Sequence, residues 1–309
     1  MCGKGGVTFI MLKVNNISKA FDDVQAVDNL SFSIKPGETM GLIGPNGSGK
    51  TTAFRMILDL LIPDNGNITW QGEKITEETF NYIGYLPEER GLYADMSIED
   101  QIIYFAELRG KSKKEIKPQI DEWMERFKIV GKKKDKVKTL SKGNQQKVQL
   151  ITTLIHEPDL IILDEPFSGL DPVNADLLMA AVKEASARGA AIIFSSHNMN
   201  NVAEISDHLL MLRYGKTRLQ GTVPEIRESY GRIHVFVETD LEDSIFEQLT
   251  GVVQVKQQNN GMTKIYLEDE AVGQEIFDLV SKDGYVQTFS QQAPNLEEIF
   301  KWEAGRENE

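Results

Sequence analysis

The chain has 309 residues, of which 40% are hydrophobic, enough for ordinary globular cores in about two domains. Its formal net charge of −13 argues against a general nucleic-acid binder, because phosphate backbones attract basic surfaces. No apolar run approaches the roughly 20 residues that span a bilayer, and no signal-peptide core precedes the first domain, so we expect a cytoplasmic protein that does not itself cross a membrane.

The first segment is predicted to be a leader. A strand-like pattern begins at Leu12, directly after Met11, and we expect residues 1–11 to be disordered. The glycine-rich residues 3–6 lack the preceding strand and following helix that a phosphate loop needs. Cys2 is the only cysteine, so no internal disulfide can form, which fits a reducing cytosol.

Residues 44–51 fit the phosphate-binding pattern G-x-x-x-x-G-K-[ST] at every fixed position. The pattern predicts a strand over Thr39–Ile43 and a helix over residues 52–58, which is the order that this motif requires. Glycines let backbone N–H groups approach phosphates, a lysine adds a cation, and a hydroxyl can ligate magnesium. The predicted nucleoside triphosphate site consists of Gly44, Asn46, Gly47, Ser48, Gly49, Lys50, Thr51 and Thr52.

Between Glu88 and Leu140 the pattern turns helical. Ser97 is a predicted N-cap with Asp100 three residues later, and a second amphipathic helix is predicted for residues 113–127. Two segments, residues 111–117 and 132–138, are rich in lysine. They either face anionic lipid headgroups or form a solvated surface, and we favour the solvated surface because charge runs usually are solvated.

Two acids follow the apolar run Leu160–Leu163, which predicts a buried parallel strand. Open α/β sheets bind ligands at the carboxyl ends of their strands. Asp164 is therefore suited to holding magnesium through water, and Glu165 to deprotonating the water that attacks a γ-phosphate. A further buried strand at residues 190–196 delivers His197 to the same edge.

After about residue 228 the chain changes to short alternating segments. Strands are predicted at residues 232–237, 252–258, 263–267 and 285–289, and helices at 244–249, 273–280 and 295–302. This order predicts a small ferredoxin-like α+β domain.

Residues 140–144, Leu-Ser-Lys-Gly-Asn, resemble the signature L-S-G-G-Q of ABC transporter ATP-binding subunits. With the phosphate loop and the acid pair, they make residues 12–227 similar to an ABC ATPase domain with a helical subdomain at about 89–150. Residues 228–309 resemble the C-terminal extension of bacterial subunits similar to sodium or drug exporters. The implied fold is α/β: a P-loop ABC-type ATPase core with a helical subdomain, then the ferredoxin-like α+β domain. The implied cofactors are ATP and magnesium.

The resemblance also implies roles for the signature. Ser141, Gly143 and Asn144 would bind the ATP held by a second subunit, and the physics is suitable because a hydroxyl, a glycine backbone and a helix N-terminus offer donors to a phosphate. Lys142 stands where the family has glycine, and Asn144 where it has glutamine. Residues 168–171 resemble the D-loop between the two nucleotide sites, with Asp171 as its acid.

Three further positions match family elements. His197 corresponds to the switch histidine that contacts the γ-phosphate, whereas the other histidines are expected to fill core or surface positions. Glu88 stands where the family has a Q-loop glutamine, and its carboxylate can still ligate magnesium through water. Phe21 falls where an aromatic ring stacks on adenine, although a core position in the first sheet is an alternative. The histidines expected to fill core or surface positions are His156, His208 and His234.

The chain carries one set of nucleotide-binding motifs, so the resemblance implies a second ATPase subunit, identical or different, and separate integral membrane permease subunits. The protein would then lie on the inner face of the cell membrane through its permease, and the tail suggests export. In the family the helical subdomain receives a cytoplasmic helix of the permease. Tyr93 and Trp123 are candidate contacts, with Trp123 better explained as subdomain core.

Two other functions are weighed against transport. A soluble ABC-type ATPase of translation usually holds two ATPase sets in one chain, and one of DNA repair inserts long coiled coils between its motifs; neither feature is present in the sequence. No nucleic-acid partner is expected. A nucleotide-binding regulator without turnover is opposed by the presence of Lys50, Asp164, Glu165 and His197.

Overall fold

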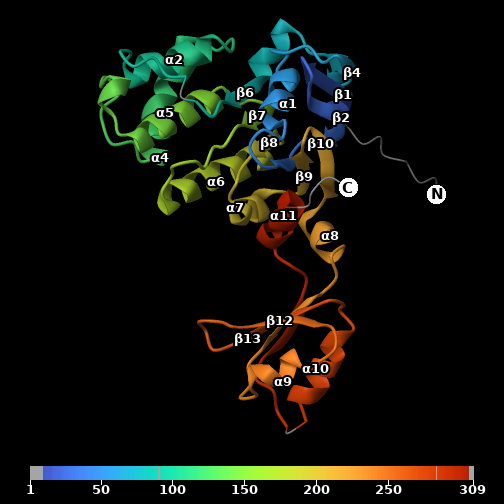
Figure 1. Cartoon of the computed structure of the whole chain (residues 1–309). Helices are drawn as coiled ribbons and strands as arrows, with labels where there is room; N and C mark the ends of the chain where they lie inside the picture. Colours follow the sequence, from blue (N-terminus) through green and yellow to red (C-terminus); the bar gives the residue numbers. More distant parts are fainter. Residues whose placement is uncertain (1–9, 90, 283, 306–309) are drawn as a thin grey trace, which may run out of the picture. The chain divides into compact units, whose positions relative to one another are not determined.

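The computed structural model describes residues 10–89, 91–282 and 284–305. They fall into two compact units, Met1–Gln220 and Gly221–Glu309 (Figure 1). The division lies after Gln220 rather than after Arg227, where the sequence pattern changes. No helix in the described part of the chain is long and apolar enough to cross a membrane.

The leader prediction is wrong at its last residue. Met11 is buried, and its N–H donates to the carbonyl oxygen of Ile34 at 2.9 Å. Its own carbonyl oxygen accepts from the N–H of Gln71 at 2.8 Å. Met11 therefore belongs to the first sheet's packing, while residues 1–9 of the predicted leader lie outside the described residues.

The first unit contains two sheets. The first is antiparallel, with order β2-β1-β4-β5. The second has six strands in the order β10-β9-β3-β8-β7-β6, with β9, β3, β8, β7 and β6 parallel along this order. The strands are β1 (Leu12–Phe21), β2 (Val24–Ile34), β3 (Thr39–Ile43), β4 (Asn65–Trp70), β5 (Glu73–Lys74), β6 (Ile83–Leu86), β7 (Leu160–Leu163), β8 (Ala191–Ser195), β9 (His208–Arg213) and β10 (Lys216–Gly221).

The helix after the phosphate loop joins the two sheets into one core. In α1 (Lys50–Ile57), Phe54 is fully buried in the same hydrophobic cluster as Leu12 of β1 and Ile162 of β7. Because β3, β8 and β7 are adjacent and parallel, their carboxyl ends meet at one edge. This edge carries the phosphate loop, both acids and the strand that leads to His197.

The helical subdomain gathers beside this core (Figure 1). The predicted N-cap is confirmed, since the Ser97 hydroxyl accepts from the N–H of Asp100 at 3.1 Å. The predicted helix over residues 113–127 is wrong as a single element: Pro118 lies in a 3-10 turn, Lys117–Gln119, between two short helices. The helices of the first unit after α1 are α2 (Ile98–Glu107), α3 (Lys113–Ile116), α4 (Ile120–Arg126), α5 (Lys142–Leu154), α6 (Pro172–Ala187) and α7 (Met199–Ile205). This unit also has 3-10 turns at Glu77–Tyr82 and Val137–Thr139.

Several lysines of the two lysine-rich segments form ion pairs. Lys117 and Lys134 both pair with the buried Glu99, at 3.3 and 2.6 Å, and Lys133 pairs with Asp121 at 2.8 Å. These contacts favour an ion-paired, solvated surface over a lipid-binding patch.

The second unit contains a four-stranded antiparallel sheet whose strands alternate with two helices in the predicted strand-helix-strand-strand-helix-strand order. One further helix precedes this arrangement in the chain and another follows it. The sheet's strand order β12-β13-β11-β14 is ferredoxin-like. The prediction for the last strand is wrong, because the strand begins at Phe289 instead of ending there and pairs with β11 from that residue on. The elements are α8 (Val223–Glu228), β11 (His234–Val237), α9 (Asp243–Glu247), β12 (Val252–Gln257), β13 (Thr263–Leu267), α10 (Val272–Val280), β14 (Phe289–Gln292) and α11 (Leu296–Gly305).

Candidate functional site

The phosphate loop connects β3 to α1 and depends on glycine at two points. Gly44 has φ +151°, and a Cβ there would lie 2.2 Å from the carbonyl oxygen of Leu212. Gly49 has φ +105°, and a Cβ there would lie 2.3 Å from the carbonyl oxygen of Ala26. Only glycine fits both the backbone conformation and the space, so these two residues fix the shape of the loop.

Lys50 is folded onto its own loop. Its Nζ donates to the carbonyl oxygens of Gly44 at 2.8 Å and Pro45 at 3.2 Å. Burial lowers the pKa of Lys50, while the nearby carboxylates of Glu165 and Asp164 raise it. The Ser48 hydroxyl is buried and makes no hydrogen bond to any described group. A cation and an unsatisfied hydroxyl in one glycine-rich loop fit a bound phosphate.

Asp164 follows β7 and faces the start of α1. Its Oδ2 accepts from the Thr51 hydroxyl at 3.1 Å, and its Oδ1 accepts from the Ser195 hydroxyl at 2.7 Å. Oxygen atoms of this kind suit magnesium, which usually keeps waters and binds through one or two protein oxygens together with substrate phosphates. Within the described residues, no cluster of three or more His, Cys, Asp or Glu side chains could hold a metal ion. The oxygens of Asp164 and Thr51 are of the kind that suit magnesium bound together with a nucleotide's phosphates.

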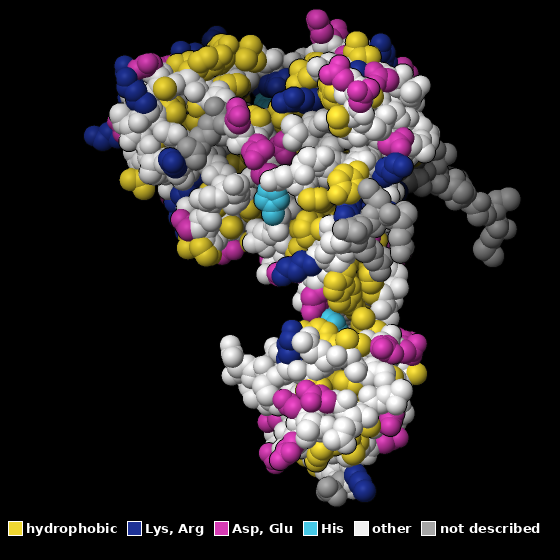
Figure 2. All heavy atoms as spheres, viewed as in Figure 1, with side chains coloured by type: hydrophobic (Ala, Val, Ile, Leu, Met, Phe, Trp, Pro, Cys, Tyr) yellow, Lys and Arg dark blue, Asp and Glu magenta, His cyan; other side chains and the backbone are white. Residues whose placement is uncertain are grey.

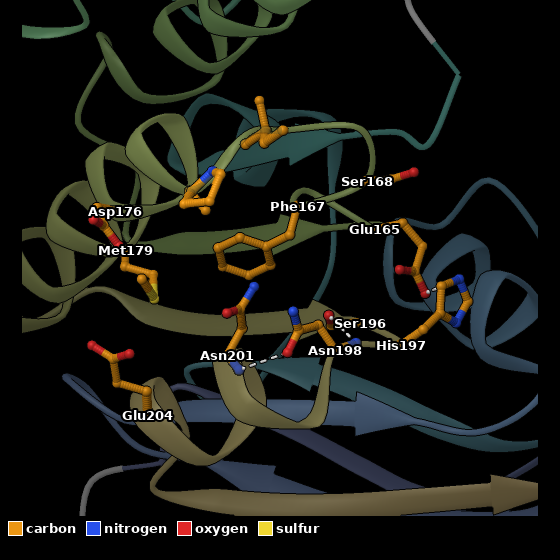
Figure 3. A pocket seen from close by; sticks show the side chains of 13 residues that line it. Glu165, Phe167, Ser168, Asp176, Met179, Ser196, His197, Asn198, Asn201 and Glu204 are labelled. Carbon is orange, nitrogen blue, oxygen red and sulfur yellow. Dashed lines mark hydrogen bonds and ion pairs between the residues drawn. The ribbon is translucent and has the colours of Figure 1, made fainter. Parts of the chain in front are cut away.

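Glu165 and His197 form a pair at the same edge (Figure 3). The Glu165 carboxylate lies 3.2 Å from His197 Nε2, and its side chain is 6% exposed against 55% for His197. Burial raises the pKa of Glu165, although His197 and Lys50 oppose this effect. The pair borders a cavity of about 420 Å³ that also includes Phe167 and Ser168. A buried carboxyl with a raised pKa beside an open cavity can act as a general base.

Glu88 and Phe21 lie at the periphery of this group. Glu88 is exposed after β6, and its charge adds to the raised pKa of Glu165 and offsets part of the lowering of the pKa of Lys50 by burial. Phe21 ends β1 with 47% of its surface exposed, so the alternative of a core phenylalanine is wrong. Its ring lies 5.9 Å from Lys19 Nζ and is free to stack on a planar ligand.

The signature residues form a second group, at the start of α5. Ser141 is the N-cap of α5, and its hydroxyl accepts from the N–H of Asn144 at 3.3 Å. Asp171 caps α6 in the same way, accepting from the N–H of Asn174 at 2.9 Å. A Cβ on Gly143 would lie 4.0 Å from Asn174 Nδ2, so the two helix starts are neighbours.

The comparisons with known proteins agree with this geometry. Residues 27–168 match the ABC transporter family model, and residues 221–304 match the C-terminal domain of DrrA1-3-like ATP-binding proteins. The chain is 43% identical over 290 residues to the ABC transporter ATP-binding protein YhaQ of Bacillus subtilis, covering 94% of this chain and 97% of that protein. The chain belongs to the ABC transporter ATP-binding proteins. It is thus an ATPase subunit of the kind that powers transport.

Two further similarities place this ABC transporter ATP-binding protein among its relatives. It is 32% identical to the Nod factor export ATP-binding protein I of Burkholderia thailandensis, covering 69% of this chain and 71% of that protein. A solved structure described as the ATP-binding subunit of an ABC transporter is 30% identical, with a TM-score of 0.68, and the match covers 72% of this chain and 93% of that chain.

Two residues near the site of this ATP-binding protein were missed by the sequence analysis. Ser195 bridges both acids, since its hydroxyl also accepts from the N–H of Glu165 at 2.7 Å. Gln146 of α5 donates through Nε2 to the carbonyl oxygen of Pro166 at 2.9 Å and so connects the signature helix to the loop after Glu165. The available signal for Ser195 was a hydroxyl at the end of an otherwise apolar strand; Gln146 had no comparable signal.

Proposed function

We propose that this ABC transporter ATP-binding protein pairs with a second ATPase subunit around ATP and magnesium, and drives export through separate permease subunits in the cell membrane. The observation that carries the proposal is the meeting of Lys50, Asp164, Glu165 and His197 at the common edge of β3, β7 and β8. A buried carboxyl next to a histidine at a phosphate loop is typical of a catalytic site and is not required for nucleotide binding alone.

Each side chain has a proposed role in hydrolysis. Lys50 holds the terminal phosphates, replacing its contacts with its own loop by contacts with phosphate oxygens. Glu165 orients the attacking water and accepts its proton, while His197 contacts the γ-phosphate. Thr51, Asp164 and Glu88 would hold magnesium, directly or through water, and the ion would neutralise charge on the phosphates. Phe21 stacks on the adenine.

The second subunit follows from the motif count. This chain has one phosphate loop and one signature, and Ser141, Gly143 and Asn144 stand with Asp171 at the neighbouring starts of α5 and α6. The N-terminus of a helix attracts anions. We propose that these residues bind the ATP held by the partner subunit, so that two chains close around two nucleotides and separate after hydrolysis.

The permease is proposed to dock on the helical subdomain. Tyr93 and Leu108 are 51% and 57% exposed, and the Tyr93 ring packs edge-on against that of Tyr104, with 5.5 Å between ring centroids. Figure 2 shows hydrophobic side chains gathered over α2 on this face. Trp123 instead stacks on Phe127 at 5.8 Å, which favours a packing role for it. An exposed aromatic patch of this kind is typical of a protein interface.

Export is supported by the name of the Burkholderia thailandensis relative, the Nod factor export ATP-binding protein I. The alternative is a soluble ABC-type ATPase that acts in translation or DNA repair. The net charge of −13 disfavours that alternative because both processes involve nucleic acid.

Purification from the host's own membranes tests the proposal. A tagged Glu165→Gln variant, solubilised gently with ATP and magnesium present, should copurify with a multi-span membrane protein in fixed stoichiometry. The Lys50→Ala variant controls for nucleotide-independent association. Recovery of Glu165→Gln only from the soluble fraction, with ribosomes or repair proteins, would contradict the transport function.

A further inference from the structure

We infer that Ser195 is a positioning residue for ATP hydrolysis: its single hydroxyl holds the Asp164 carboxylate and the Glu165 backbone in place together. This inference rests on the proposed role of Asp164 in binding magnesium. Ser195 ends β8 and is completely buried. β7 and β8 are paired in parallel, with Leu163 opposite Phe194, so the next residues along each strand meet at the sheet edge.

The hydrogen bonds at Ser195 have a defined direction. The backbone N–H of Glu165 can only donate, so the Ser195 Oγ accepts that bond, at 2.7 Å. The hydroxyl proton then remains to donate to Asp164 Oδ1, also at 2.7 Å. Position 195 therefore needs a group that donates and accepts at once, which alanine cannot supply.

The first consequence concerns Asp164. Each of its carboxylate oxygens has a different donor, Ser195 for Oδ1 and Thr51 for Oδ2. Two donors on opposite oxygens fix the plane of a carboxylate. Oδ2 is thereby held beside the Thr51 hydroxyl, where both oxygens can serve the same magnesium ion.

The second consequence concerns Glu165. Its φ of +50° is uncommon for a residue with a side chain, and its N–H is fixed by Ser195. Two residues after Ser195, His197 pairs with the carboxylate of Glu165 at 3.2 Å. The segment that leaves β8 thus contacts Glu165 at its backbone and at its side chain.

The test measures metal binding as well as turnover, using the full chain. Mn²⁺ is titrated in the presence of a non-hydrolysable ATP analogue, and free Mn²⁺ is followed by electron paramagnetic resonance. For Ser195→Ala we expect the Mn²⁺ dissociation constant to rise and kcat to fall, each by about tenfold, as for other groups that orient a metal ligand. Affinity for the analogue in EDTA should not change. Ser195→Thr keeps the hydroxyl and should recover most of both losses.

Ser186→Ala is the matched control. The Ser186 hydroxyl donates to the carbonyl oxygen of Gly37 at the same 2.7 Å, and its loss should leave Mn²⁺ affinity unchanged. Equal Mn²⁺ affinity in wild type and Ser195→Ala, or equal losses in the two alanine variants, would overturn the inference. Wild-type protein that binds Mn²⁺ no better than Asp164→Asn would remove the proposed magnesium site and the inference with it.

Discussion

Lys50 makes hydrogen bonds to two carbonyl oxygens of its own loop, and these bonds tie its side chain to the loop backbone. The Ser48 hydroxyl lies in the same loop without a partner among the described groups, which leaves a donor for an incoming phosphate. On binding, Lys50 would exchange these two carbonyl contacts for contacts with phosphate oxygens, while the Ser48 hydroxyl would gain its first partner among the described groups.

Lys50→Ala should weaken ATP binding by about tenfold or more, equivalent to about 1.4 kcal/mol, because the terminal phosphates lose their cation. The measurement is the equilibrium affinity for a fluorescent ATP analogue. Lys35→Ala is the control, since Lys35 is an exposed lysine that pairs with Glu38 at 2.9 Å. Normal affinity in Lys50→Ala would discredit the phosphate-loop role.

The pH dependence of hydrolysis should report Glu165. Burial raises its pKa, and His197 lowers it in part. A general base works only when deprotonated, so activity should fall as the pH drops through a value above the usual range of a glutamate, about 4.3. His197→Ala removes the lowering contribution and should move this acid limb to higher pH. The profile of kcat/KM against pH checks both statements, and a limb unmoved in His197→Ala would contradict the pairing.

At the scale of elements, the cap of α2 is a local source of stability for the helical subdomain. The Ser97 hydroxyl accepts from the N–H of Asp100 and donates to its carboxylate at 2.6 Å. Ser97→Ala should lower the free energy of unfolding by about 1 kcal/mol, measured by urea denaturation. Ser97→Asn retains a capping oxygen and should remain within a few tenths of a kcal/mol of wild type. An alanine variant as stable as wild type would show that the cap does not contribute.

Elements whose signals are local could be predicted from the sequence. The bounds of β3, β7 and β13 agree with the sequence prediction. For β7 the reason is an apolar run that ends at two acids, which is typical of a buried strand. The first strand of the second unit and its helices α9, α10 and α11 were placed within a few residues, whereas α8 was not predicted. The phosphate loop could be identified because all the fixed residues of its motif lie within eight consecutive positions.

Features that depend on distant parts of the chain could not be predicted. The break in the predicted helix over residues 113–127 is different, because its cause is local: Pro118 lies inside that segment and removes a backbone donor. The position of β14 follows from its pairing with β11, in which Phe289 lies opposite Val237, and not from the strand propensity of the preceding segment. Ser195 acts through residues of another strand, and Gln146 through a carbonyl twenty positions away. Only the packed structure brings these groups together.

At the scale of the whole molecule, the second unit has its own hydrophobic cluster, formed by residues such as Phe246 and Ile276. We propose that it regulates the ATPase or stabilises the pair of subunits. Deletion of residues 221–309 should leave the first unit folded, with its melting temperature within a few degrees, because that unit's core contains none of the deleted residues. Subunit association, ATPase rate or transport should change. A truncated protein unaltered in all three would contradict the role.

We propose that two chains share two ATP molecules and that Glu165 ends this state by hydrolysis. The most direct measurement is the mass of Glu165→Gln in solution by light scattering, with magnesium and either ATP or ADP. With ATP, we expect Glu165→Gln to form a stable dimer that retains uncleaved ATP, with turnover nearly abolished. With ADP, we expect it to be a monomer. Monomers at every protein concentration in ATP, or wild-type turnover in this variant, would contradict it.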